Sequence, residues 1–226
     1  VIRLSSARAA EFEKLVEGIY RDVNIALANE LALAAMKLGV NFYEIREAAN
    51  SQPYCHLHLP GAGVGGYCIP VYPYFMMHQV LAKNYIMELT RLARRINESM
   101  PYVVVSLVEE LRKKVELKPN NIKVVVLGAA FRGNIDDTRL SPTRDITALL
   151  KARGYRNIIV HDPFVKSDPV LEELGIILTG DLEEALKGAD VVVVATRHYT
   201  YKGLKLSEII RLSSKKPLIV DATAFI

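Results

Sequence analysis

Five short runs of β-branched and aliphatic residues, all after residue 118, constrain the fold of this 226-residue chain more than any other feature. Each run is apolar on both faces, which is typical of strands in a parallel sheet that helices cover on both sides. Stretches of helical pattern separate the runs, which are IKVVVLG, NIIVHD, IILT, VVVVAT and LIVDA. This alternation predicts a doubly wound α/β domain over residues 119–226.

The first half of the chain has a helical pattern instead. Apolar residues recur every three or four positions over residues 6–38, which predicts one long amphipathic helix closed by Gly39. Asn41, with a glutamate three residues later, resembles a capping box and predicts a second helix over residues 41–50. Residues 1–118 are therefore expected to form an all-helical domain.

Two further helices are expected before the boundary at residue 118. The first follows a loop over residues 51–74 and covers residues 75–98. Pro101 suits the first turn of the second helix, because that turn needs no N–H donor, and Pro119 terminates it.

The expected loop contains the sequence GAGVGGYCIP, in which glycines lead to Cys68 and then to Pro70. Glycines expose the backbone, so a substrate can approach closely and N–H groups can hold an oxyanion, as a nucleophilic cysteine requires. Pro70 is expected to prevent a helix from starting here. A lone cysteine is, however, more often a small buried apolar residue than a nucleophile. Both interpretations of Cys68 stay open at this point.

Residues 61–66 also fit G-x-G-x-x-G, the dinucleotide-binding fingerprint. That motif acts only between a strand and a helix, whose N-terminus receives the pyrophosphate. Pro60 precedes the glycines, Pro70 and Pro73 follow them, and no apolar strand leads in. We therefore reject a dinucleotide site in this loop.

Composition and charge exclude several classes of function. The formal net charge of +4 is too small to indicate nucleic-acid binding, and the basic runs at 91–95 and 112–114 are typical of solvated helix faces. The apolar runs are strand-sized, so no membrane span is expected. Two cysteines without a disulfide framework and no opening signal peptide favour the cytoplasm. The chain starts in a helical segment without methionine, as if an upstream segment were missing.

In the α/β domain, the first strand is expected to end at Gly128, and ligands bind beyond the carboxyl ends of such strands. Arg132 and Arg139 follow, and Ser141-Pro142 opens a helix. Arginines beside a helix N-terminus suit phosphate recognition. A surface loop of ion pairs with Asp136 and Asp137 explains the same pattern equally well.

Histidines and acids elsewhere give weaker signals. His56 and His58 alternate with leucine, but two histidines without a third ligand seldom form a metal site, and we expect no metal. Asp162 follows a strand, where an acid can bond a ribose but is more often a cap or turn former. The remaining candidates are His161 beside it, His198 and Tyr199 at the end of a later strand, and Cys55 as an incidental thiol.

Three motifs in order, RDVNIALANELA, GAGVGGYCIPVYPYF and LGAAFRGNIDDTRLSP, resemble the UDP-glucose and UDP-N-acetylmannosamine dehydrogenases. The RDVNIA variant is more similar to the second branch. The resemblance covers the family's central helical dimerisation domain and its C-terminal, Rossmann-like UDP-binding domain. It implies that the family's N-terminal NAD domain is not in this chain.

The resemblance also implies roles for individual residues. Family members oxidise the C6 alcohol of a UDP-sugar to a carboxylate in two NAD-dependent steps, through a cysteine thiohemiacetal and a thioester. Cys68 matches the nucleophile, and Lys14 matches the lysine that stabilises the oxyanion. The remaining matches are Arg21, Gly65, Phe131 and Arg132 for substrate binding and Arg139 for the cofactor.

Five positions depart from the family pattern. Gly18 replaces an asparagine four residues after the lysine, and Tyr72 replaces an aspartate four residues after the cysteine, where a carboxylate assists hydrolysis. Tyr67 and Gln52 stand where this branch has histidine, and Tyr54 stands where it has arginine. Together the changes predict an altered or weakened active site, with thioester hydrolysis affected most.

The leading hypothesis is therefore the thiol and UDP-binding portion of an NAD-dependent UDP-sugar dehydrogenase for UDP-N-acetyl-D-mannosamine, in polysaccharide biosynthesis. This chain alone is not expected to transfer hydride. The alternative is a non-catalytic, dimeric UDP-sugar-binding remnant, and a simple α/β ligand-binding module ranks last because it leaves the cysteine loop unexplained. A homodimer is expected from the resemblance and from the long amphipathic helices.

Overall fold

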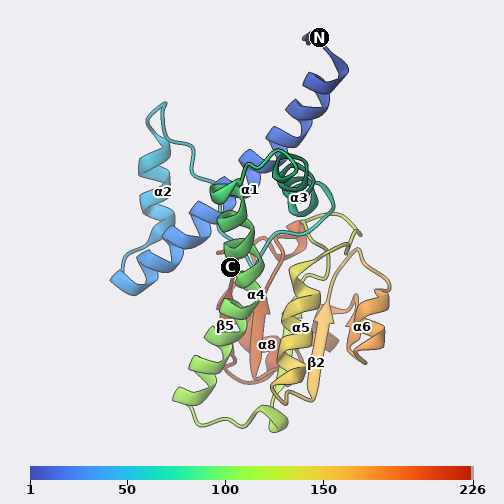
Figure 1. The fold of residues 1–226 in the computed structure, drawn as a ribbon. Coiled ribbons are helices and arrows are strands. Elements are labelled where there is room, and N and C mark those ends of the chain that lie inside the picture. Colours follow the sequence, from blue (N-terminus) through green and yellow to red (C-terminus); the bar gives the residue numbers. More distant parts are fainter. Residues whose placement is uncertain (225–226) are drawn as a thin grey trace. The chain divides into compact units, whose positions relative to one another are not determined.

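The computed structural model describes residues 1–224, which form two compact units. The first unit contains residues 1–60 and 67–98, and the second contains residues 61–66 and the chain from Ser99 onward. In chain order the elements are α1 (Ala7–Leu38), α2 (Phe42–Asn50), α3 (Cys68–Leu81), α4 (Glu88–Lys114), the 3-10 helix η1 (Pro119–Asn121), β1 (Lys123–Leu127), α5 (Pro142–Ala152), β2 (Asn157–His161), α6 (Pro169–Glu173), β3 (Ile177–Thr179), α7 (Leu182–Leu186), β4 (Val191–Val194), the 3-10 helix η2 (Tyr199–Tyr201), α8 (Leu206–Ser213) and β5 (Leu218–Asp221) (Figure 1).

Helix α1 forms the long helix that the sequence predicts. The Ser6 hydroxyl accepts a hydrogen bond from the Ala9 N–H at its start, and Gly39 ends it in the left-handed conformation (φ 69°). The apolar stripe of α1 is nevertheless exposed towards both ends of the helix, with Phe12 at 55% and Leu27 at 42%. Small residues such as Gly18 are buried instead, since they allow neighbouring helices to approach closely.

The prediction of a loop through residue 74 is wrong, because α3 begins at Cys68 and includes both Pro70 and Pro73. The first turn of a helix has no intrahelical acceptor for its N–H groups, so Pro70 fits there at little cost. Pro73 lies further inside and leaves the Ile69 carbonyl without its usual partner. Both prolines are buried, and their packing offsets this loss.

The expected helix over residues 75–98 is also wrong in its bounds. Helix α3 ends at Leu81, and Asn84 has a positive φ of 59° in the turn before α4. Helix α4 then continues through Pro101, although the sequence predicts this proline in the first turn of a separate helix, and ends at Lys114. Burial of Val104 and its neighbours in the core of the second unit stabilises this helix despite the proline.

A buried polar network joins α1 to the first part of α4 within the first unit. Arg94 donates to Oδ1 of Asp22 at 2.6 Å, and the Asn97 amide donates to the same oxygen at 2.8 Å. Asn29 donates in turn to the Asn97 carbonyl oxygen at 2.9 Å. Because Asp22 is fully buried, these hydrogen bonds offset the cost of removing its carboxylate from water.

The second unit contains the parallel five-stranded sheet that the five apolar runs predict. The strand order is β3-β2-β1-β4-β5, and every neighbouring pair is parallel. From β1 the chain adds β2 and β3 on one side of the sheet and then β4 and β5 on the other, so the strand order switches between β1 and β4, as in doubly wound folds. The predicted all-helical segment followed by a doubly wound α/β sheet is thus confirmed.

Side chains alternate between the two faces of this sheet. On β1, Val124 and Val126 join a core with residues of α4, α5 and α6. Val125 and Leu127 point into a second core with residues of α7 and α8. Helices therefore cover both faces, which explains why the strands read as continuous apolar runs.

The compact units divide within α4, between Glu98 and Ser99, whereas the sequence places a domain boundary after residue 118. That boundary stays a prediction. None of the helices in the described part of the chain is both long enough and apolar enough to cross a bilayer.

Candidate active site

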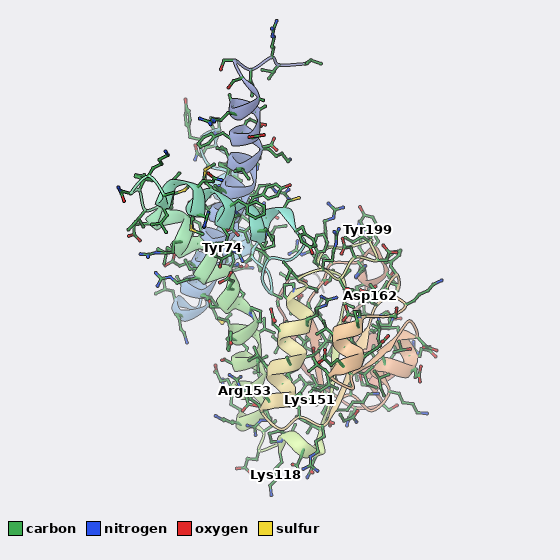
Figure 2. The ribbon with its side chains drawn as sticks, turned by 45° about the vertical axis from the view of Figure 1, so that its right-hand side comes forward. Tyr74, Lys118, Lys151, Arg153, Asp162 and Tyr199 are labelled. Atoms are coloured by element: carbon green, nitrogen blue, oxygen red, sulfur yellow. The ribbon has the colours of Figure 1, made fainter. Side chains whose placement is uncertain are left out.

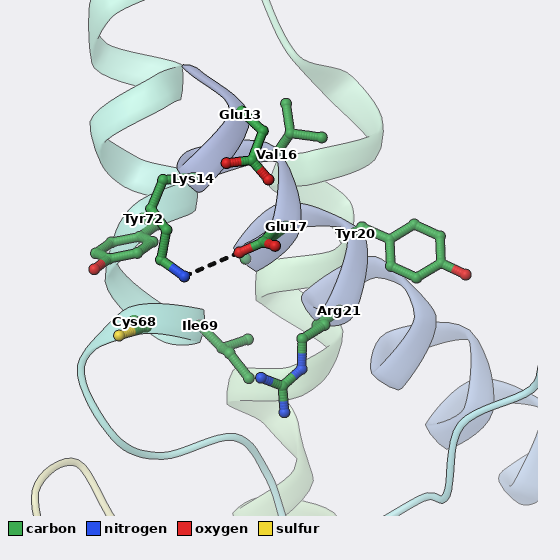
Figure 3. Close-up of a pocket in the computed structure, with 10 residues that line it drawn as sticks. Glu13, Lys14, Val16, Glu17, Tyr20, Arg21, Cys68, Ile69 and Tyr72 are labelled. Carbon is green, nitrogen blue, oxygen red and sulfur yellow. Dashed lines mark hydrogen bonds and ion pairs between the residues drawn. The ribbon is translucent and has the colours of Figure 1, made fainter. Parts of the chain in front are cut away.

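A pocket of about 490 Å³ in the first unit gathers several of the predicted site residues between α1 and α3 (Figure 3). Helix α1 contributes Lys14 and Arg21, which lie seven residues apart and therefore two turns along one face. Helix α3 contributes Cys68. The structure thus brings together the thiol and two cations that the resemblance assigns to the active site.

Cys68 is an exposed, free cysteine at the first position of α3. Tyr67, the N-cap residue, makes no side-chain cap, and Pro70 lacks an N–H. Backbone N–H groups of a first helical turn have no intrahelical acceptor and favour negative charge nearby. The exposed position contradicts the interpretation of Cys68 as a buried apolar residue and suits a reactive thiol.

Lys14 forms an ion pair with Glu17, one turn along α1, at 2.9 Å (Figure 3). Hydrogen bonding and charge from Glu17 raise the pKa of Lys14, and the nearby Tyr72 and Cys68 raise it further. Lys14 is therefore a cation that the pocket keeps protonated. The Arg21 guanidinium forms no hydrogen bond or ion pair with another residue in the described range 1–224, which leaves its donors available to a ligand.

Tyr72 and Gly18, two of the departures from the family pattern, contact each other in this pocket. A Cβ atom on Gly18 would lie 3.2 Å from Cδ2 and 3.4 Å from Cβ of Tyr72. Hydrogen bonding to Cys68 and the charge of its thiolate raise the pKa of Tyr72. The tyrosine that replaces a carboxylate is therefore a neighbour of the thiol.

The other departures lie outside this pocket. Tyr54 is 96% exposed and Gln52 is exposed beside it, in the turn after α2. Tyr67 is 56% exposed. His56 and His58 pack edge to face with 5.8 Å between ring centroids. Within residues 1–224 no three potential metal ligands lie together.

The glycines of residues 61–66 belong to the second unit, where they pack on the loop after β1. A Cβ on Gly65 would lie 2.5 Å from Phe131 Cβ and 2.6 Å from the Leu140 carbonyl oxygen. The Gly66 N–H donates to the Arg139 carbonyl at 2.8 Å. Glycine is required here because backbone lies directly on backbone. No strand precedes these glycines among the described residues, although a helix does follow them, contrary to expectation.

The two arginines of the β1 loop have different surroundings. Arg139 forms a bidentate ion pair with Asp137: its Nε donates to Oδ1 at 2.9 Å and its Nη2 donates to Oδ2 at 2.6 Å, so the ion-pair interpretation holds for this residue. Arg132 is exposed and has no ion pair within the described chain. Phe131, beside it, is half-buried against the glycine segment. Arg132 is therefore the arginine of this loop with donors available for phosphate.

Asp162, which follows β2, directs its carboxylate at the backbone N–H groups of the turn after β1. Its Oδ2 accepts hydrogen bonds from the N–H groups of Ala129 (2.7 Å) and Ala130 (3.0 Å). Its Oδ1 accepts from Phe164 and Val165. Burial raises its pKa, but the His198 contact and the backbone hydrogen bonds outweigh burial and hold the pKa at about 2. Asp162 is thus a turn former rather than a free ribose ligand.

His198 completes this arrangement from the loop after β4. Its Nδ1 accepts a hydrogen bond from the Asn134 N–H at 3.0 Å, and its Nε2 lies 3.1 Å from Oδ2 of Asp162. Since Nδ1 accepts, Nε2 carries the proton in the neutral ring. His198 is fully buried, while Tyr199 is 75% exposed. Figure 2 shows Asp162 and Tyr199 at one end of the second unit, with Lys151 and Arg153 at the other.

His161, the last residue of β2, is buried and structural. Its Nδ1 lies 2.8 Å from the hydroxyl of Tyr201, and its Nε2 lies 3.2 Å from the Gly180 carbonyl. Burial lowers its pKa, so the ring stays neutral. Cys55 is half-buried and away from the pocket lining. Neither residue takes part in the pocket.

The strand order, parallel register and doubly covered sheet define the second unit as a Rossmann-like α/β domain. This is the class of fold that binds nucleotides beyond the carboxyl ends of its strands.

Comparison with known families narrows that class. The central-domain model of the UDP-glucose/GDP-mannose dehydrogenase family matches residues 8–99, and the UDP binding domain model of the same family matches residues 125–226. The chain belongs to the UDP-glucose/GDP-mannose dehydrogenase family.

Its relatives include the UDP-N-acetyl-D-mannosamine dehydrogenase of Pyrococcus horikoshii, which is 40% identical over 221 residues, 97% of this chain and 49% of the relative. The solved structure of UDP-D-ManNAc dehydrogenase from that organism superposes with a TM-score of 0.86 at 38% identity, over 99% of this chain and 50% of the other. An NDP-N-acetyl-D-galactosaminuronic acid dehydrogenase from Methanosarcina mazei gives a TM-score of 0.89 at 32% identity, over 98% and 48%. The chain spans about half the length of the curated relatives that it matches.

Proposed function

We propose that this chain supplies the thiol and the UDP-binding residues of an NAD-dependent UDP-sugar 6-dehydrogenase. The observation that carries the proposal is the convergence of Cys68, Lys14 and Arg21 on one pocket of the first unit. The names of the relatives support UDP-N-acetyl-D-mannosamine as the proposed substrate, and its oxidation would give UDP-N-acetyl-D-mannosaminuronate.

The pocket residues suit the covalent part of this reaction. The Cys68 thiolate adds to the C6 aldehyde, so an S–C bond forms and the carbonyl π pair moves to oxygen, which then takes a proton. The Lys14 ammonium stabilises the negative charge on that oxygen. After oxidation to the thioester, water adds to the carbonyl carbon, the C–S bond breaks, and the carboxylate and the Cys68 thiol are released.

The described residues do not fit the pyrophosphate of NAD. In Rossmann-like domains the turn after the first strand offers its N–H groups to that pyrophosphate. Here Ala129 and Ala130 donate those N–H groups to the Asp162 carboxylate. NAD is the hydride acceptor that the resemblance implies, and we assign no transfer step to residues of this chain. The proposed contact of Arg139 with the cofactor requires its Asp137 ion pair to open.

A UDP-binding role is proposed for the second unit by itself. Arg132 offers exposed guanidinium donors that suit the diphosphate, and Phe131 beside it offers an aromatic face to the nucleotide. Gly65 keeps the backbone next to Phe131 free of side chains.

A homodimer is proposed as the assembly. The apolar stripe of α1 includes Phe12, Leu27 and Leu31, all more than one-third exposed. Apolar side chains aligned on one helix face are typical of a surface that a partner covers. Light scattering of the purified chain measures this directly: a monomer at micromolar concentration would contradict the proposal.

The second candidate is a non-catalytic UDP-sugar-binding protein that shares the same fold. Tyr72 in place of the family's carboxylate is the observation that favours it, because a phenol is a poor general base near neutral pH.

Calorimetric titration with UDP and with UDP-N-acetyl-D-mannosamine tests the binding function that both candidates share. We expect both ligands to bind the parent chain and Arg132→Ala to abolish binding. Arg153→Ala is the matched control. Arg153 is exposed on the same unit, but it follows the C-terminal end of α5, whereas Arg132 lies in the loop before α5 (Figure 2). Absence of binding to the parent chain, or equal loss in both variants, contradicts the assignment of Arg132.

A further inference from the structure

We propose that Tyr72 is a catalytic residue that donates a hydrogen bond to the Cys68 thiolate, and that Gly18 provides the space for its ring. This inference rests on the proposed role of Cys68 as nucleophile. It treats the two departures from the family pattern as one coordinated change.

The packing of α1 against α3 shows that the two positions depend on each other. Gly18 is buried in the middle of α1, where glycine weakens a helix by about 1 kcal/mol relative to alanine. The Tyr72 ring fills the space that this glycine leaves: any Cβ at position 18 would lie 3.2 Å from the ring atom Cδ2. A side chain at position 18 would require the Tyr72 ring to shift, so the glycine favours the observed position of the ring.

The same packing places Tyr72 and the Cys68 thiol in the lining of one pocket. Cys68 and Tyr72 are four residues apart on α3 and lie on the same side of the helix (Figure 3). A hydrogen bond with Cys68 is the first cause of the raised pKa of Tyr72, so the phenol keeps its proton at neutral pH. A protonated phenol is a donor, and it stabilises a thiolate without taking part in proton transfer.

Other charged groups face this thiol and act on its charge as well. Those that line the pocket are Glu13, Lys14, Glu17 and Arg21 on α1. Tyr20 on the same helix lines the pocket as well, but its ring points away from Cys68 (Figure 3). Lys14 favours the thiolate and the two glutamates disfavour it. Because Glu13, Lys14, Glu17 and Arg21 are present in every variant below, their effect on the thiol is common to all of them.

The test is the pH dependence of iodoacetamide alkylation at Cys68, followed by mass spectrometry of the 226-residue chain in a Cys55→Ser background. Loss of a hydrogen bond to a charged group lowers the thiolate fraction about tenfold. A less stabilised thiolate is also about threefold more nucleophilic. Tyr72→Phe should therefore slow alkylation about threefold at pH 7 and accelerate it about threefold at the alkaline limit.

This crossing of the two profiles separates a hydrogen-bonding role from a structural one, since a change in access shifts the rate in the same direction at every pH. Tyr20→Phe is the matched control: Tyr20 lines the same pocket, but its ring points away from Cys68 (Figure 3). Its profile should coincide with that of the parent chain.

A second variant tests the part played by Gly18. Gly18→Leu should displace the ring and give the profile of Tyr72→Phe, with no further change when the two are combined. The milder Gly18→Ala gives the same shift in smaller measure if the leucine variant does not fold.

The possible outcomes distinguish this inference from the proposed function. Superimposed profiles for the parent chain and Tyr72→Phe overturn the role of Tyr72, while Cys68 keeps its own. If Cys68 in the parent chain reacts no faster at pH 7 than N-acetylcysteine, both the nucleophile assignment and this inference fall.

Discussion

The carboxylate of Asp162 should control how the stability of the second unit depends on acid. Its pKa is about 2 in the fold, against 3.8 for an ordinary aspartate, and this difference corresponds to about 2.5 kcal/mol of stability. A group whose pKa is depressed by folding contributes this stability above its unfolded pKa. The contribution is lost as the pH falls from about 4 to about 2.

Asp162→Asn removes this contribution at neutral pH. The amide also places an NH₂ group against backbone N–H donors, since both carboxylate oxygens accept backbone hydrogen bonds in the parent chain. We expect the variant to lose about 2–4 kcal/mol at pH 7. Urea unfolding at a series of pH values from 7 to 2 measures the free energy of unfolding of both proteins.

The decisive quantity is the difference in free energy of unfolding between parent and variant. It should shrink by about 2 kcal/mol between pH 5 and pH 2, because the parent loses the ionised carboxylate that the variant never had. Asp136→Asn, at an exposed aspartate, should leave the pH dependence unchanged. A parent–variant difference that is constant over this range would refute the role assigned to the Asp162 charge.

Two further substitutions test packing in the first unit by chemical denaturation. In a Tyr72→Ala background, Gly18→Ala should raise the free energy of unfolding by about 1 kcal/mol through helix propensity. In the parent chain the same substitution should raise it clearly less, because the new Cβ contacts the Tyr72 ring. Equal increases in the two backgrounds contradict the contact. Asp22→Ala should cost about 3–5 kcal/mol because Arg94 stays buried without its main partner. Asp22→Asn keeps an acceptor oxygen and should cost less.

The sequence predicts the parts of this fold that depend on neighbouring residues. The end of α1 at Gly39 follows from local backbone chemistry and is confirmed, as is the start of α2, where the Asn41 side chain accepts from the Tyr43 N–H. The same holds for α5, where Ser141 caps the helix and Pro142 takes its first position. The strands were equally visible, because strands buried on both faces must be continuously apolar.

The errors arise where tertiary packing outweighs local preference. Pro73 and Pro101 lie inside helices that their surroundings stabilise, and no pattern in the neighbouring sequence reveals this. The outward direction of Phe12 on α1 has the same origin, since periodicity identifies an apolar face but not what covers it.

The candidate site was predictable only in part. Resemblance identifies Cys68, Lys14 and Arg21, and their shared pocket supports the grouping. The contact between Gly18 and Tyr72 joins positions 54 residues apart, so a sequence shows two isolated departures where the structure shows one contact. The ion pair of Lys14 with Glu17 has the i,i+3 spacing that is a known signal on a helix, so this contact was predictable from the sequence.

The glycine segment of residues 61–66 also has a consequence for the order in which the chain folds. Its partners, Phe131 and Leu140, lie about 70 positions later, and Ala62 within it is buried in a core with residues of α4, α5 and the sheet. During synthesis the segment therefore leaves the ribosome long before its binding surface exists. Closing so long a loop slows folding, so the second unit can complete its core only late, after its own sheet has begun to form.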